Sequence, residues 1–274
     1  MNNKRNRLLG GPFKVWTIAF TVSPLFLIFY YGFTSRETGA FTLENILAIT
    51  SPVYGKALLL ALGLSLVSTV VCLVLAYPLA MILAGRKSVS SGLIVMIFII
   101  PMWMNFLLRT LAWQTLLEKT GVINSVLSFF NLPSLNIINT PWAIVLGMVY
   151  NFLPFMLLPI YNTLSKIDPA IINAAKDLGA GSVQTFARII FPLSLPGVIS
   201  GITMVFVPAL TTFVISDLLG GSKILLIGNV IEQQFKQVNN WNVGSGLSLV
   251  LMVFILISMA VMNRYDKDGE GIAL

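Results

Sequence analysis

The sequence of 274 residues contains no histidine, one cysteine and only 10 acidic residues. Without histidine, the chain has neither a Ser-His-Asp or Cys-His nucleophile system nor an imidazole-ligated metal site. The single cysteine, Cys72, excludes an internal disulfide and a multi-thiolate metal site. Charged residues make up 10% of the chain, whereas soluble domains contain about 25%. These scarcities exclude a disulfide scaffold, a disordered chain and a typical soluble enzyme.

Hydrophobic residues make up 57% of the chain, and many of them occur in long apolar runs. A helix crosses the hydrocarbon core of a bilayer with about 20 apolar residues. Six stretches meet this requirement, namely 14–33, 57–84, 92–116, 142–164, 197–215 and 247–262. The first is too long for a signal peptide and has no clear small-residue cleavage site after it, so we expect an uncleaved span. The sequence predicts an all-α membrane protein with six transmembrane helices.

The distribution of basic residues predicts the orientation of these spans. The two ends of the chain and the second and fourth loops hold Lys4, Arg5, Arg7, Lys14, Arg86, Lys87, Lys166, Lys176, Arg188, Arg264 and Lys267. The remaining loops hold only Arg36, Lys56, Lys119, Lys223 and Lys236. Both termini are therefore expected to be cytoplasmic. We interpret the net charge of +7 as a topology signal and not as a nucleic-acid-binding surface.

The predicted cytoplasmic loop 166–191 contains a short helix with a signal at each end. Asp168 is a favoured N-cap, and Pro169 suits the first helical position. Gly179 is typical of the left-handed residue that ends a helix, and Ser182 is expected to cap a second helix after it. A helix capped at both ends favours a docking element for a cytoplasmic partner. The alternative is an interfacial helix that lies on the lipid.

The same loop resembles the EAA motif of permease subunits in ABC importers, which reads E-A-A-x3-G-x9-I-x-L-P. The corresponding residues here are Asn173, Ala174, Ala175, Gly179, Ile189 and Pro192, with Asn173 in place of the family's Glu and Phe191 in place of its Leu. In that family the segment is the coupling helix, which sits on the ATPase subunit. The resemblance implies a MetI-like permease fold with a core of about 57–262, inside a single transmembrane domain of 14–265. A cytoplasmic N-terminus (1–13) and tail (266–274) would flank it.

Further segments, 149–159, 174–180, 216–221 and 225–231, resemble permeases for spermidine and putrescine. This resemblance implies ATP-driven polyamine import across the bacterial inner membrane. It also implies a second permease subunit (PotC-like), a pair of cytoplasmic ATPase subunits (PotA-like) and an extracytoplasmic polyamine-binding protein (PotD-like). The chain contains no G-x-x-x-x-G-K-[ST], so we expect a non-catalytic pore subunit that needs no cofactor and takes its energy from a partner.

Three other functions compete with this interpretation. The coupling segment alone also allows an ABC permease for amino acids or molybdate. A secondary transporter would be expected to have ion-coupling acids or inverted repeats near the midplane, and the sequence has no clear sign of either. An intramembrane enzyme is disfavoured because histidine and a paired-acid constellation are both missing.

A polycationic substrate calls for carboxylates and aromatic faces along its path. Asp217 is the best candidate, because a continuous helix from Pro196 would rise about 31 Å and place it at the outer mouth. Its alternative role is that of a turn residue before Gly220. Glu232 in the next loop is a second candidate.

The spans themselves offer three more candidates for the substrate path. Tyr150 and Asn151 would lie roughly 12–14 Å inside the fourth span, where lipid cannot satisfy their polar groups. Trp103 in the third span is the other candidate, with a place in the interfacial aromatic belt as its alternative. Arg109 would lie near the outer end of that span, where we expect it to snorkel or to pair with an acid.

Overall fold

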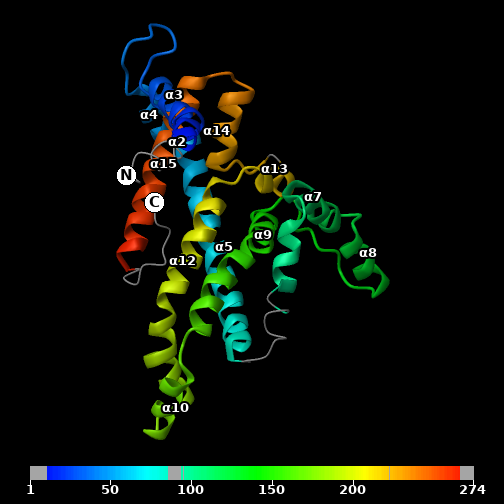
Figure 1. The fold of residues 1–274 in the computed structure, drawn as a ribbon. Helices are drawn as coiled ribbons and strands as arrows, with labels where there is room; N and C mark the ends of the chain where they lie inside the picture. Colours follow the sequence, from blue (N-terminus) through cyan, green and yellow to red (C-terminus); the bar gives the residue numbers. More distant parts are fainter. Residues whose placement is uncertain (1–10, 86–93, 95, 222, 266–274) are drawn as a thin grey trace, which may run out of the picture. The chain divides into compact units, whose positions relative to one another are not determined.

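The computed structural model describes residues 11–85, 94, 96–221 and 223–265 (Figure 1). The first ten residues, Arg86 and Lys87, the beginning of the third predicted span and the tail 266–274 lie outside these ranges. Within them the chain forms helices joined by turns, with one isolated β-bridge between Thr34 and Phe41. The all-α prediction is confirmed.

Five helices of the described part of the chain are long and apolar enough to cross a membrane. They are Val15–Gly32, Pro52–Gly85, Pro141–Ser165, Ser182–Thr211 and Trp241–Met262. A bent pair, Met96–Trp103 with Phe106–Phe129, makes a sixth when it is counted as one span. This count agrees with the six predicted spans.

The contacts divide the described residues into two compact units. The first combines residues of Met1–Lys56 with Val230–Ile255, and the second combines Ala57–Asn229 with residues of Leu256–Leu274. The helices before the third span are α2 (Gly11–Thr17), η1 (Ile18–Val22), α3 (Ser23–Gly32), α4 (Glu44–Leu47), η2 (Ala48–Thr50) and α5 (Pro52–Gly85). Those up to the fourth loop are η3 (Ile100–Trp103), α7 (Phe106–Leu117), α8 (Val122–Phe129), α9 (Pro141–Ser165) and α10 (Pro169–Asp177). The remaining helices are α11 (Ser182–Thr185), η4 (Phe186–Ile190), α12 (Phe191–Thr211), α13 (Val214–Gly220), α14 (Ile227–Lys236) and α15 (Trp241–Tyr265).

Two asparagines hold the first unit together at the end of α3. Asn45 Nδ2 donates to the carbonyls of Gly32 at 3.2 Å and Thr34 at 2.9 Å. Asn242 Nδ2, at the start of α15, donates to the same Thr34 carbonyl at 2.6 Å. Side-chain amides thus satisfy the carbonyls that the end of the first span leaves without helical partners.

The second unit is centred on α9 and α12, which lie side by side (Figure 1). Gly197 and Gly201 of α12 face α9, where a Cβ at either position would meet Thr163 or Met156. The absence of a side chain lets the two backbones approach, as the G-x-x-x-G spacing predicts. α13 packs on α9 next to Gly147, at which a Cβ would meet Ile215 and Leu219.

The third and fifth predicted spans are not continuous helices, which corrects the sequence-based boundaries. The third is bent by 99° between Trp103 and Phe106, and Asn105 Oδ1 accepts from the backbone N–H groups of Leu107 and Leu108. The fifth begins earlier than residue 197 and ends at Thr211, before the separate helix α13. The apolar pattern continues through both breaks, so hydropathy alone does not reveal them.

Within the described ranges, two π-helical turns occur, η1 and η4, and each ends two residues before a proline. The N–H of Ser23 donates to the Ile18 carbonyl before Pro24, and the N–H of Phe191 donates to the Phe186 carbonyl before Pro192. Proline lacks an N–H, and its ring crowds the carbonyl four residues before it. A wider turn at that point makes room for the ring, so the helix continues through the proline.

Candidate functional site

The candidate coupling helix is α10, and both of its predicted ends are confirmed. Asp168 accepts from the N–H of Ala170 at 2.9 Å, and Pro169 occupies the first turn. Gly179 has a φ of +81°, and its N–H donates to the Lys176 carbonyl at 2.9 Å. The N–H of Ala180 donates to the Ala175 carbonyl at 3.0 Å, which completes a Schellman C-cap. α10 is therefore defined by its own local sequence.

The helix that follows starts one residue earlier than predicted. Gly181 and not Ser182 is the N-cap of α11, and Ser182 is the first helical residue. The side chain of Gln184, the third helical residue, accepts from the N–H of Gly181 at 3.2 Å. The capping side chain thus comes from inside the helix and not from the N-cap residue. Ser182 was the plausible cap by residue type, but the Gln184 side chain fixes the helix start at Gly181.

α10 lies at one end of α9 and α12 (Figure 1). Large apolar side chains of α10, of its C-cap and of α11 are exposed. Leu178 is 89% exposed, Val183 is 79% exposed and Ile171 is 46% exposed. Of the motif residues, Asn173, Ala174 and Gly179 are exposed and Ala175 is buried. Ile189 lies in η4, half-buried, and Pro192 lies in the first turn of α12. An apolar surface on a rigid, capped helix is suited to packing against another protein.

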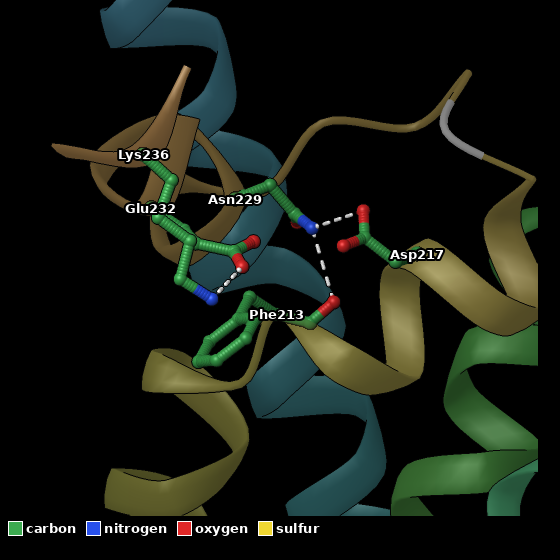
Figure 2. Close-up of polar contacts among 5 residues, drawn as sticks. All are labelled: Phe213, Asp217, Asn229, Glu232 and Lys236. Carbon is green, nitrogen blue, oxygen red and sulfur yellow. Dashed lines mark hydrogen bonds and ion pairs between the residues drawn. The ribbon is translucent and has the colours of Figure 1, made fainter. Parts of the chain in front are cut away.

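Asp217 belongs to a hydrogen-bonded cluster around Asn229 (Figure 2). Asn229 Nδ2 donates to Asp217 Oδ1 at 2.7 Å and to the Phe213 carbonyl at 3.0 Å. Asn229 Oδ1 accepts from Ser216 Oγ at 2.6 Å and from the N–H of Leu226 at 3.1 Å. Asn229 is 1% exposed, and the cluster joins the break after α12 to the beginning of α14.

The position of Asp217 differs from the one expected for a continuous helix. The rise from Pro196 is interrupted after Thr211, and Asp217 lies in the first turn of α13. A carboxylate at the beginning of a helix is favourable because the N–H groups there carry partial positive charge. Asp217 therefore has a structural reason to be acidic besides any contact with a cation.

Glu232 lies on α14 and forms an ion pair with Lys236, one helical turn later. The Lys236 Nζ to Glu232 Oε1 distance is 2.9 Å, and the Glu232 side chain is 24% exposed (Figure 2). The segment is thus a helix and not the loop that the sequence suggested. The lysine neutralises the Glu232 charge, although such a surface pair contributes little to stability.

Tyr150 and Asn151 lie next to each other on α9 but make different contacts. The Tyr150 ring packs edge-on against Trp113, with 5.1 Å between centroids, and Arg109 Cζ lies 5.8 Å from its centre. Asn151 is 1% exposed and donates to the Gly147 carbonyl at 2.7 Å, while its Oδ1 has no hydrogen-bond partner. Asn151 is therefore buried inside the second unit, whereas Tyr150 is 37% exposed despite its ring contacts.

Arg109 neither snorkels nor extends to an acid, contrary to expectation. It is 8% exposed, and its guanidinium donates to the Pro101 carbonyl at 2.8 Å. The third span bends before Phe106, so the rise along a straight helix does not place Arg109, and its guanidinium bonds back to the chain before the bend. Trp103, at the end of η3, is 77% exposed and lies outside this cluster.

The structure brings Asp217 together with Asn229, and Tyr150 with Arg109 and Trp113. Asn229 was not predicted from the sequence, although a lone amide within the apolar run 225–231 was a usable signal. In the described part of the chain, no group of three or more Cys, Asp or Glu side chains is arranged to hold a metal ion.

Comparison with known families and proteins identifies the class to which this fold belongs. Residues 76–268 match the family described as binding-protein-dependent transport system inner membrane component, and the chain belongs to this family. Similar proteins include the spermidine/putrescine transport system permease protein PotB of Haemophilus influenzae, 34% identical over 97% of this chain and 96% of that protein. PotB of Escherichia coli is 37% identical over 92% of this chain and 94% of that protein.

A solved structure agrees on the fold. A bacterial alginate ABC transporter in complex with alginate pentasaccharide-bound periplasmic protein contains a similar chain, with a TM-score of 0.79 and 17% identity. The match covers 99% of this chain and 98% of that chain. The protein is a multi-pass inner-membrane permease with the MetI-like fold of ABC importers.

Proposed function

We propose that this chain is the permease subunit that forms half of the translocation pore in an ATP-driven importer of spermidine and putrescine. The observation that carries the proposal is its similarity, over nearly its whole length, to permeases whose names specify these substrates. Permeases for amino acids or molybdate share the coupling segment. They are the alternative that a transport experiment must exclude.

The proposed source of energy is a cytoplasmic ATPase pair that docks on α10. Support comes from the two helix caps and from the exposed apolar side chains of Ile171, Leu178 and Val183. Asn173, Ala174 and Gly179 lie on the same exposed segment, whereas Ile189 and Pro192 continue it into α12. The chain itself is a non-catalytic pore subunit. ATP-driven closure of the ATPase pair would displace α10 and alternate the access of the pore.

The proposed assembly also contains a second permease subunit and an extracytoplasmic polyamine-binding protein. The alginate transporter with the similar chain was solved in complex with a periplasmic protein, which supports the general arrangement. Docking of an ATPase on α10 requires the loop 166–191 to be cytoplasmic. Both termini of a six-span chain then lie on the cytoplasmic side, in agreement with the distribution of lysine and arginine.

The proposed substrate path includes Asp217, Glu232, Tyr150, Asn151 and Trp103. Asp217 has the strongest support, since a carboxylate attracts a polyamine and the pair with Asn229 fixes its position. The exposed Trp103 ring offers a face for cation–π contact. Arg109 already lies near the Tyr150 ring, so Tyr150 would meet a cation only after a rearrangement.

Uptake of radiolabelled spermidine and putrescine tests the proposal. Cells lacking other polyamine importers would carry the chain with its partner subunits, and unlabelled polyamines, amino acids or molybdate would compete. The proposal predicts ATP-dependent uptake that only polyamines inhibit. Uptake of an amino acid or molybdate without polyamine uptake would assign the chain to a different importer.

A further inference from the structure

Tyr77 of α5 contacts η4 and the beginning of α12, the segment that follows α10 and α11 in the chain. It lies directly before Pro78 and is 8% exposed. Its hydroxyl oxygen lies 2.8 Å from Ser194 Oγ on α12. Ser194 Oγ also donates to the Phe191 carbonyl at 2.8 Å, so a Tyr77 hydroxyl that donates to Ser194 completes a chain of two hydrogen bonds into α12.

The Tyr77 ring also packs against both ends of the π-helical turn η4. Its centroid lies 5.8 Å from that of Phe186, the first residue of η4, with the rings perpendicular. It lies 6.0 Å from the centroid of Phe191, the first residue after η4. Phe186 and Phe191 are 6.1 Å apart, so the three rings form one cluster. Such aromatic contacts favour a fixed mutual orientation.

The π turn η4 lies between α11 and α12, on the path from α10 into α12. π-helical turns are rare, and a displaced helix can absorb motion there by changing its hydrogen-bond register. A displacement of α10 would therefore be lost in η4 unless both ends of the turn were held. The Tyr77 ring holds both ends, and its hydroxyl holds Ser194 one turn further into α12.

We propose that Tyr77 is a positioning residue that transmits the displacement of α10 to α5 by bracing η4. This inference rests on the proposed function, because a docked ATPase is the source of the displacement. It also gives Phe191 a role at the position where the EAA motif has Leu, since its aromatic ring completes the cluster with Tyr77.

The test is the ratio of ATP hydrolysed to spermidine imported by the full complex in proteoliposomes. Tyr77→Phe keeps the ring and removes only the hydroxyl. We expect this ratio to rise roughly two- to tenfold, while hydrolysis stimulated by the binding protein is retained. Ser194→Ala should give the same change, and the double variant should add little to either single one. Tyr161→Phe removes a hydroxyl from α9 outside the cluster and should leave the ratio unchanged.

Two results would overturn the inference. One is an unchanged ratio in both Tyr77→Phe and Ser194→Ala. The other is a parallel fall of hydrolysis and uptake, which would mean that the hydroxyl pair only stabilises the fold. A wild-type complex that imports no polyamine would instead contradict the proposed function, so the two failures are distinguishable.

Discussion

Asn229 shows how a single side chain can hold an irregular backbone inside an apolar protein. Its amide makes two bonds as donor and two as acceptor, to Asp217, Phe213, Ser216 and Leu226. Both hydrogens of the amide and both lone pairs of its oxygen are used. Because lipid cannot replace these partners, the break between α12 and α13 depends on this residue.

Asn229→Leu should therefore destabilise the protein strongly. The substitution removes four hydrogen bonds. The Phe213 carbonyl keeps its bonds from Ser216 Oγ and from the N–H of Asp217, but the N–H of Leu226 loses its acceptor, and leaving a buried donor unsatisfied typically costs about 1–3 kcal/mol. The measurement is thermal unfolding of the purified complex in detergent. Asn162→Leu, at an exposed position of α9, is the matched control and should melt like the wild type. Equal melting of the two variants would contradict this account of the cluster.

Asp217→Asn separates charge from shape in the same cluster. An asparagine at 217 can still accept from Asn229 through its amide oxygen, so assembly should be retained. Loss of one charge-assisted contact with the polyamine, typically worth about 1.5–3 kcal/mol, should reduce uptake roughly tenfold or more. The assay is uptake of labelled spermidine and putrescine at equal expression. Wild-type uptake would limit Asp217 to its structural role in α13.

The sequence predicted helix ends that depend on neighbouring residues. It did not predict helix ends that depend on residues distant in the chain. Asp168 and Gly179 define α10 through bonds to neighbouring residues, so their types were sufficient. The break after Thr211 depends on Asn229, which bonds to a carbonyl 16 residues away in the chain. No apolar periodicity encodes that contact, and a continuous fifth span was the natural but wrong prediction.

Gly179→Ala tests the importance of the α10 C-cap. The backbone at 179 has a positive φ and open space around it, so the added methyl group costs roughly 1 kcal/mol through backbone strain alone. We expect weaker retention of the ATPase in a pull-down and a several-fold loss of uptake.

Gly181→Ala is the control for this substitution. Gly181 has a φ of −70° and also lies in open space, and its N–H keeps the bond to the Gln184 side chain. Its retention of the ATPase should match that of the wild type. If Gly179→Ala behaves in the same way, the C-cap does not contribute to docking.

For the molecule as a whole, the orientation in the membrane determines which loops can meet which partners. The distribution of basic residues predicts that both termini lie in the cytoplasm. A reporter fused after Leu274 should be active only on the cytoplasmic side, and one inserted near Thr38 only on the outside. The opposite pattern would move the loop 166–191 to the outside and rule out ATPase docking on α10.

The central claim is that a separate ATPase drives this permease through α10, and site-specific crosslinking tests it directly. Leu178→Cys places a thiol at an 89% exposed position, while the native Cys72 is fully buried. Leu59→Cys is the control, because Leu59 is 70% exposed and lies near the N-terminal end of α5. We predict that a short bifunctional reagent joins Leu178→Cys, but not Leu59→Cys, to the ATPase subunit in a transporting complex. Absence of the Leu178→Cys product in a complex that imports polyamine would contradict the account.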